Sequence, residues 1–162
     1  YAHKQSTEEM VKANVVDTVE TVLTLYSNQL KHSVDLVTNF DRSLPEISCY
    51  PDELHQVWTN IIHNGLQAMD NKGKLQIDVE KEGNKFAVVK ITDFGPGIPA
   101  EVLPKIFNAF FTTKKAGEGS GLGLDICKKI IEKHSGTIEV DTEPGRTTFI
   151  IKLPLVTTAV PA

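Results

Sequence analysis

The sequence predicts an α/β (α+β) two-layer sandwich, in which a mixed and mostly antiparallel sheet packs against three helices. Two observations support this fold class. Segments with helical periodicity are interleaved with segments in which apolar and polar residues alternate. Short turns join the strand-like segments, whereas the parallel strands of a doubly wound fold need long crossovers. A length of 162 residues is enough for one domain with a real core and too short for two.

The N-terminal half predicts two helices and one strand. The first helix is expected over residues 14–33, where apolar residues recur at helical spacing and Asn14 is a candidate N-cap. Residues 34–40 are a candidate strand, and residues 41–51 are expected to form a loop because they contain two prolines. The second helix is expected over residues 51–70, since proline and acidic residues favour its first turn.

The C-terminal half predicts two hairpins around a third helix. Residues 73–95 alternate as two strands do, on either side of a Glu-Gly-Asn turn. Residues 99–111 form a short helical or irregular piece, and the third helix is expected from about Gly121 to His134. A second hairpin over residues 136–156 is closed by a Glu-Pro-Gly turn.

We expect a single domain over residues 11–157, preceded by a polar connector (1–10) and followed by a frayed tail (158–162). The chain begins without Met, which suggests a piece of a longer protein. Cys49 and Cys127 are far apart in the sequence and show no metal-site spacing, which is typical of inert thiols in a reducing compartment.

Charge and hydropathy argue against two classes of partner. A net charge of -4, with no dense Lys/Arg cluster, argues against a nucleic-acid partner. No apolar stretch approaches membrane-spanning length and no signal peptide opens the chain. We therefore expect no membrane contact by this fragment.

The polar face of the second helix is a candidate binding wall. Its residues lie opposite the apolar face, at Gln56, Asn60, Asn64 and Gln67. A solvated face is the ordinary explanation, but Asn is a mediocre helix former and a merely wet surface would favour Glu, Lys or Arg. A neutral amide oxygen can instead ligate Mg²⁺ together with nucleotide phosphates. The residues alone leave both interpretations open.

A turn rich in glycine and proline follows the strand that ends at Asp93. Asp and Gly are the residues expected in any tight turn, so the pattern is a weak signal by itself. A carboxylate at a buried strand end can also accept a hydrogen bond from the exocyclic amine of adenine. Gly95 and Gly97 would then let the base lie close against the backbone.

Glycines alternate before the third helix, at positions 117, 119, 121 and 123. A flexible linker is one explanation. Alternatively, the unpaired N–H groups and the positive dipole end of the helix face phosphates that the loop encloses. Thr112, Thr113 and Lys114 would add hydroxyl donors and positive charge to a lid over a triphosphate. The spacing matches neither the Walker nor the dinucleotide-binding pattern.

Five segments together resemble the N, G1, F, G2 and G3 boxes of the catalytic ATP-binding domain of sensor histidine kinases. In order, they are NIIHNGLQAM, DFGPGIP, IFNAFFTTK, GEGSGLGLDI and GRTTF. The resemblance runs from about Val11 to Leu155 and implies the Bergerat (GHKL) fold, with ATP between the helical layer and a flexible ATP lid. It also implies that residues 1–10 are a remnant of the preceding dimerisation and phosphoacceptor helices.

The resemblance implies roles for individual residues, with ATP and Mg²⁺ as the ligands. Asn64 matches the asparagine that ligates Mg²⁺, and Asn60 matches the polar residue one helical turn before it. Asp93 matches the adenine-binding aspartate, and Thr147 the threonine near it. Asn60, Asn64 and Lys114 are thereby the expected catalytic residues.

The F and G2 boxes complete the expected site. Phe107, Phe110 and Phe111 match aromatic positions that anchor the lid. The full set of residues expected to contact the nucleotide or its metal is Asn60, Asn64, Gln67, Asp93, Gly95, Gly97, Ile98, Phe107, Thr112, Thr113, Lys114, Ser120, Gly121, Leu122, Gly123, Leu124 and Thr147.

One departure from the family pattern, at Gln67, and one difference from the related ATPases, at Asn60, bear on the chemistry. Gln67 stands where many relatives carry Lys or Arg toward the phosphates, which leaves Lys114 as the better candidate for that charge. Related ATPases, such as DNA gyrase, have a glutamate at the position of Asn60 as general base for water, and an amide cannot take a proton at neutral pH. The resemblance therefore implies a kinase, which transfers the γ-phosphoryl group of ATP to a protein histidine.

None of the five histidines sits in the family's acceptor pattern. The acceptor is therefore expected on a separate dimerisation and histidine phosphotransfer domain of the parent kinase, and the next partner is a response regulator receiver domain. We expect a cytoplasmic location whether or not the parent is anchored in a membrane. The alternatives are a GHKL protein serine kinase of the anti-sigma type and a nucleotide-binding regulatory module.

Overall fold

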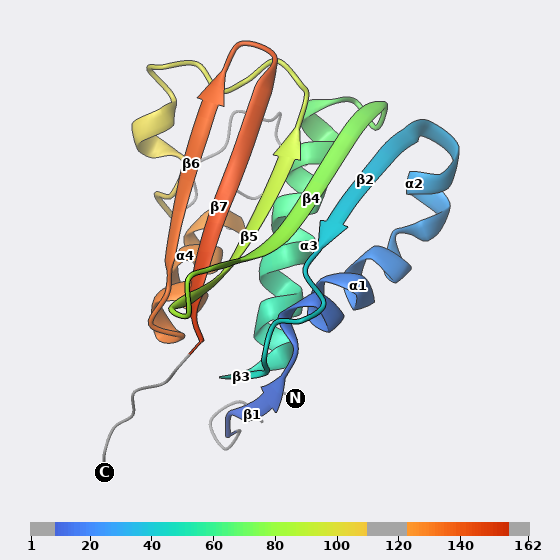
Figure 1. The fold of residues 1–162 in the computed structure, drawn as a ribbon. Coiled ribbons are helices and arrows are strands. Elements are labelled where there is room, and N and C mark those ends of the chain that lie inside the picture. Colours follow the sequence, from blue (N-terminus) through green and yellow to red (C-terminus); the bar gives the residue numbers. More distant parts are fainter. Residues whose placement is uncertain (1–8, 110–122, 156–162) are drawn as a thin grey trace, which may run out of the picture.

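The computed structural model describes residues 9–109 and 123–155. Its main layer is a five-stranded sheet in the order β2-β4-β5-β7-β6 (Figure 1). β2 and β4 are parallel and the other three neighbouring pairs are antiparallel, which confirms the mixed, mostly antiparallel sheet. The strands of this sheet are β2 (Val34–Phe40), β4 (Gly73–Glu82), β5 (Phe86–Asp93), β6 (Thr137–Glu143) and β7 (Arg146–Pro154).

The second layer is helical and covers one face of the sheet (Figure 1). Within the described ranges it comprises α1 (Val15–Leu25), α2 (Ser27–Ser33), α3 (Pro51–Ala68) and α4 (Gly123–Lys133). α3 packs against α1, α4 and β5, and so lies at the centre of the layer. A short 3₁₀ helix, η2 (Leu103–Lys105), lies within the segment that was expected to be helical or irregular.

The first helix differs from the prediction, because it is two helices. Asn14 does cap α1, since its Oδ1 accepts a hydrogen bond of 2.8 Å from the Val16 N–H. The helix ends at Leu25, and the N–H of its C-cap Tyr26 is shared between the carbonyls of Val22 and Leu23. α2 begins at the next residue, Ser27, and Tyr26 between the two helices has a non-helical backbone (φ -100°, ψ 9°). The layer therefore has four helices in the described residues instead of the three predicted.

Two short strands were also missed by the sequence analysis. β1 (Val11–Ala13) and β3 (Ile47–Cys49) pair as a separate antiparallel ribbon. The sequence predicted no strand at the start of the domain, where β1 lies. It placed the residues of β3 in a proline-containing loop. Strands of three residues are too short to show a period of two. Their pairing joins segments that are distant in the sequence, so no local pattern predicts it.

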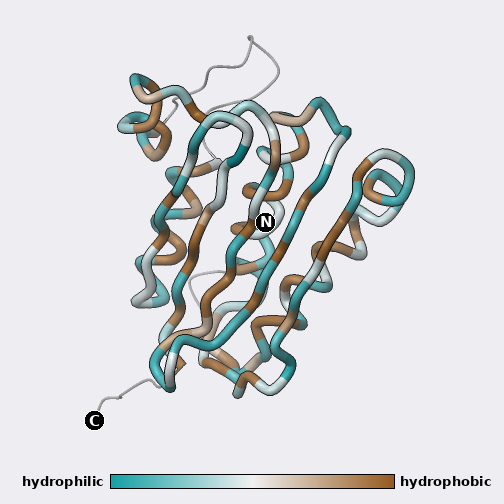
Figure 2. Tube along the Cα trace, turned by 45° about the horizontal axis from the view of Figure 1, so that its top comes forward, coloured by the Kyte–Doolittle hydropathy of each residue, from teal (hydrophilic) through white to brown (hydrophobic). Residues whose placement is uncertain are grey.

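The core lies between the two layers. Hydrophobic and hydrophilic residues alternate along the strands (Figure 2), and in β4 this puts Leu75, Ile77 and Val79 on the buried face. Trp58, on α3, is fully buried. Both predicted hairpins are present, with turns at residues 83–85 and at Pro144-Gly145. No helix in the described part of the chain is long and apolar enough to cross a membrane.

Both cysteines are unpaired and buried. Burial raises the pKa of the Cys49 thiol, and it raises the pKa of Cys127 to about 12. A thiol that stays protonated is a poor nucleophile. The structure thus agrees with the inert thiols predicted from the sequence.

A polar contact is buried inside the core between α1 and α3. The indole Nε1–H of Trp58 donates to Thr18 Oγ1 at 2.9 Å, and this hydroxyl donates to the carbonyl of Val15 at 2.7 Å. Thr18 is itself only 4% exposed. Water therefore cannot replace the hydroxyl, and the position needs both an acceptor and a donor.

We predict that Thr18→Val lowers the free energy of unfolding by about 1–3 kcal/mol, because it leaves the indole N–H buried without an acceptor. Urea denaturation followed by the fluorescence of the single tryptophan measures this directly. Thr21→Val is the matched control, since the Thr21 hydroxyl makes an exposed bond on the same helix. Its effect should stay within about 0.5 kcal/mol. Equal losses in the two variants would contradict the buried contact.

Candidate active site

One end of the sheet carries a row of polar residues on its helix-facing side. Asp93 of β5 lies opposite Thr147 of β7, and Thr147 lies opposite Thr142 of β6. Directly opposed residues in antiparallel strands point to the same face. The next row toward the core consists of Ile91, Phe149 and Val140. The apolar layer therefore ends abruptly at Asp93, and a hydrogen-bonding surface begins there.

Asp93 is the buried charge of this row, with 7% of its surface exposed. Its Oδ1 accepts a hydrogen bond of 3.0 Å from the Gly95 N–H. Burial raises the pKa of the carboxyl group, and the Gly95 N–H opposes this shift. Among the described residues, the Gly95 N–H is the hydrogen-bond donor to this carboxylate.

Gly65 of α3 provides the space beside Asp93, and it is not among the site residues predicted from the sequence. A Cβ at this position would lie 3.2 Å from Asp93 Cβ and 3.5 Å from Oδ2. Any side chain would therefore press on the carboxylate. The available signal was a glycine inside a helix, which costs stability and usually has a packing or functional reason.

The amide side chains of α3 lie beside Gly65. Asn60, Asn64 and Gln67 are half-buried, whereas Gln56 is exposed. Asn60 donates from Nδ2 to the carbonyl of Gly123 at 3.3 Å, which ties α3 to the first residue of α4. Gln67 Oε1 is buried and has no hydrogen-bond partner among the described residues. An orphaned amide oxygen at this place is what a site for a polar ligand would leave.

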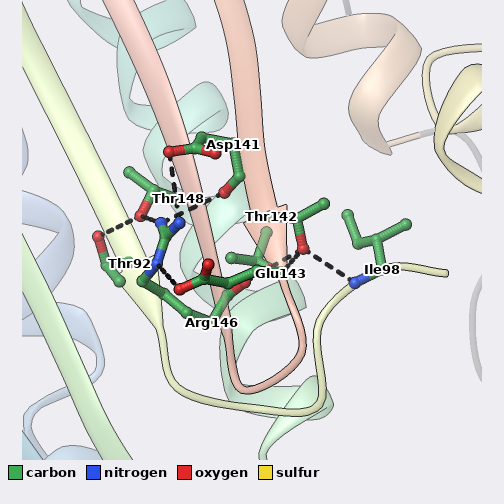
Figure 3. Close-up of polar contacts among 8 residues, drawn as sticks. Thr92, Ile98, Asp141, Thr142, Glu143, Arg146 and Thr148 are labelled. Atoms are coloured by element: carbon green, nitrogen blue, oxygen red, sulfur yellow. Dashed lines mark hydrogen bonds and ion pairs between the residues drawn. The ribbon is translucent and has the colours of Figure 1, made fainter. Parts of the chain in front are cut away.

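The loop after Asp93 passes between the end of α3 and the β6–β7 turn. A Cβ on Gly95 would lie 3.1 Å from the carbonyl oxygen of Ala68, so the loop touches the end of α3. Gly97 has φ +90°, and a Cβ there would lie 2.3 Å from the carbonyl oxygen of Glu143. Ile98 N–H donates to Thr142 Oγ1 at 3.0 Å (Figure 3). Both predicted glycines thus serve close backbone contacts.

The remaining predicted residues fall into two groups. Phe107 is half-buried and packs edge-on against Phe149, with ring centroids 6.4 Å apart. Gly123 and Leu124 open α4. The other predicted positions lie outside the described residues: Phe110, Phe111, Thr112, Thr113, Lys114, Ser120, Gly121 and Leu122.

The start of α4 faces the amides of α3. A Cβ on Gly123 would be 3.7 Å from the side-chain amide of Asn60. The dipole of α4 puts a partial positive charge toward this N-terminal end of the helix. The site therefore combines a buried carboxylate, neutral amides and a helix N-terminus, which suit an amine, a hard cation and an anion, respectively.

A comparison with protein families agrees with this set of groups. The family model described as "Histidine kinase-, DNA gyrase B-, and HSP90-like ATPase" matches residues 49–157. The sensory histidine kinase/phosphatase NtrB of Escherichia coli O157:H7 is 34% identical over 155 residues, which cover 90% of this chain and 44% of NtrB. The sensor histidine kinase ZraS of Escherichia coli K12 is 40% identical over 114 residues, covering 70% of this chain and 24% of ZraS. The chain thus spans less than half the length of these relatives.

Solved structures show the same fold. The catalytic domain of histidine kinase ThkA, in a nucleotide-free form, superimposes with a TM-score of 0.81 at 32% identity, covering 91% of this chain and 96% of that one. ThkA in complex with the response regulator protein TrrA gives a TM-score of 0.77 at 28% identity, over 91% of this chain and 42% of that one. The chain belongs to the family of histidine kinase-, DNA gyrase B- and HSP90-like ATPases. Within this family it is an ATP-binding catalytic domain of the sensor histidine kinase type.

The two glycines at the loop contact allow a matched test. Gly97 and Gly145 have nearly the same φ, +90° and +95°, but a Cβ on Gly145 would meet nothing within 4 Å. We predict that Gly145→Ala costs roughly 1–2 kcal/mol through backbone strain alone. Gly97→Ala should cost about 1–3 kcal/mol more, because its methyl group collides with the backbone at Glu143. Urea denaturation of both variants measures the difference, and equal losses would argue against the close contact.

The charge of Asp93 predicts a pH effect on stability. Folding raises the pKa of this carboxyl above its ordinary value of 3.8. The protonated form therefore favours the folded state below that value, and the contribution is lost as pH rises through the raised pKa. Asp93→Asn does not titrate and can keep the bond from the Gly95 N–H. Its free energy of unfolding relative to wild type should therefore rise as the pH increases from about 4 through the raised pKa of Asp93, in the absence of nucleotide. A difference that is constant over this range would show that the charge is not buried.

Proposed function

We propose that this chain binds Mg·ATP and supplies the nucleotide half of a protein histidine kinase. In the parent protein it transfers the γ-phosphoryl group to a histidine on a separate dimerisation domain, for onward relay to a response regulator. The observation that carries the proposal is the buried carboxylate of Asp93, which lies against Gly65 of α3, the helix whose Asn60 contacts the start of α4. ATP offers an amine at one end and phosphates at the other.

The adenine end of the site is built on Asp93. Oδ1 is held by the Gly95 N–H, which orients the carboxylate. Oδ2 lies beside Gly65 and can accept a hydrogen bond from the exocyclic amine of adenine. Thr147 lies next to it in the row, and Gly97 and Ile98 are held against the β6–β7 turn. The base would therefore be enclosed by parts of the protein that are already fixed.

The phosphate end of the site is built on α3 and α4. Asn64 would ligate Mg²⁺ through its amide oxygen, and neutralisation of phosphate charge is what the bound metal supplies. Asn60 holds the first residue of α4, so that the N–H groups of this helix face the phosphates. Lys114, which lies outside the described residues, is proposed as the cationic group over the γ-phosphate. Gln67 adds a neutral amide at the position where many relatives carry the positive charge of Lys or Arg.

Transfer to a protein is favoured over hydrolysis by the residues near Asn64. Asn60 cannot act as a general base for water, because an amide does not take a proton at neutral pH. Going from Asn60 toward the N-terminus of α3, the first carboxylate is that of Glu53. It lies in the first turn of the helix, and its Oε2 is paired with Lys133 Nζ at 2.8 Å. Phosphoryl transfer then depends on positioning the donor and the acceptor in line.

The proposed partners follow from the reaction. The acceptor histidine comes from the dimerisation and histidine phosphotransfer domain of the parent, and the phosphoryl group continues to a receiver domain. The ThkA–TrrA complex supports the second partner, because there a related kinase is bound to a response regulator. As part of this proposal, the domain works in the cytoplasm, where its ATP is found.

Calorimetry with Mg·ADP tests the nucleotide site. We expect binding in about the micromolar range or weaker for the wild type, and a loss of about tenfold or more in Asp93→Asn, which no longer offers a carboxylate to the amine. Asn64→Ala should reduce the affinity in the presence of Mg²⁺ toward the value without the metal. A folded wild-type protein that gives no heat with ADP or ATP would refute the proposal.

The acceptor is tested by adding the helical hairpin of the parent protein and labelled ATP. We expect an acid-labile and base-stable phosphate on the hairpin, as a phosphohistidine gives. Substitution of the hairpin histidine by alanine should abolish the label. An acid-stable label would instead indicate a serine or threonine acceptor, and it would overturn the histidine kinase assignment.

A further inference from the structure

We infer that Thr142 is a positioning residue for adenine recognition, because it fixes the direction of the hydrogen bond from Thr147 and holds the loop that follows Asp93. This inference rests on the nucleotide site proposed above and extends it to a residue outside the five sequence boxes. It concerns specificity for a 6-amino purine over a 6-oxo purine.

The Thr142 hydroxyl has three hydrogen-bond partners. It receives the Ile98 N–H at 3.0 Å, lies 2.8 Å from Thr147 Oγ1, and lies 3.1 Å from the carbonyl oxygen of Arg146. Figure 3 shows Thr142 at the end of β6, with Ile98 of the loop on one side and the hairpin on the other. A hydroxyl group has one proton and two lone pairs, so three partners use its full capacity.

The chemistry of the partners determines which atom donates in each bond. Ile98 N–H can only donate, and the Arg146 carbonyl can only accept. The single proton of Thr142 must therefore point to the Arg146 carbonyl. The bond between the two threonines can then form only if Thr147 donates its own proton to Thr142.

Thr147 consequently has only lone pairs left to offer. It lies directly opposite Asp93 and on the same face of the sheet. The ionised carboxylate of Asp93 is likewise an acceptor. The side chains of Asp93 and Thr147 thus both offer hydrogen-bond acceptors, which suit the exocyclic amine of adenine and repel the 6-oxo group of hypoxanthine.

The position of the Arg146 carbonyl is itself fixed. On the other face of the sheet the Arg146 guanidinium donates to Thr148 Oγ1 at 2.8 Å and pairs with Asp141 and Glu143 at 3.3 Å each (Figure 3). These contacts clamp both strands at the turn. The acceptor that orients the Thr142 proton is therefore part of a rigid hairpin end.

The test compares Mg·ADP with Mg·IDP, whose base carries a 6-oxo group in place of the amine, by calorimetry. We expect Thr142→Val to weaken ADP binding by about tenfold and IDP binding by less, so that the preference for ADP shrinks, because the Thr147 proton becomes free to donate. Thr142→Ser keeps the hydroxyl and should restore both affinities. Thr92→Val is the matched control, because Thr92 shares a buried 2.8 Å hydroxyl pair with Thr148 at the adjacent position of the sheet, on the opposite face. It should leave the ADP to IDP ratio unchanged.

The outcomes separate the two proposals. A wild-type protein that binds neither nucleotide refutes the proposed function, and the inference falls with it. Wild-type binding together with an unchanged ADP to IDP ratio in Thr142→Val overturns the inference alone. A ratio that changes equally in Thr92→Val also overturns it, since the effect would then be general loosening of the sheet. If Thr142→Val does not fold, amide exchange of Ile98 in the wild type decides: fast exchange contradicts the bond to Thr142, and protection supports it.

Discussion

The site depends on one buried carboxylate at the place where the apolar layer of the sheet ends. Asp93 lies between Leu75 and Thr147 of the neighbouring strands, and its charge is costly there because little water reaches it. The surroundings lower that cost at one oxygen through the Gly95 N–H and leave room at the other beside Gly65. A ligand that donates to the second oxygen would complete the solvation of the charge. The buried charge of Asp93 thus lowers the stability of the empty domain, while the same charge would favour binding of a ligand.

Helix α3 connects the core to this site. Its N-terminal half carries Trp58, which is fully buried and hydrogen-bonded to Thr18 of α1. Its C-terminal half carries Asn60 and Asn64, followed by Gly65, which lies against the carboxylate of Asp93. The helix is packed along its whole length, with Ile62 and Leu66 fully buried in its C-terminal half, and it presents its amides from another face. Such an arrangement keeps the groups in place before any ligand arrives, which is what transfer by positioning requires.

The sequence could predict those features that are coded locally. The alternation of β4 and β5, the Asn14 cap and the turn glycines after Asp93 each follow from neighbouring residues, and the structure has all of them. The missed features depend on contacts between distant segments. β1 and β3 are three-residue strands that exist only as a pair, and Gly65 is explained only by the approach of Asp93 to α3. Thr142 looked like any strand threonine until the register put it beside Thr147.

The burial of both thiols has a practical consequence for labelling. Cys49 and Cys127 are the only two cysteines of the chain, and each is at most 1% exposed. A cysteine introduced at an exposed position would therefore be the sole site that a maleimide dye reaches in the native protein. Fluorescent or spin probes could therefore be attached without prior removal of the natural sulfhydryls. The two natural cysteines would therefore contribute no label of their own to a spectroscopic experiment on the native protein.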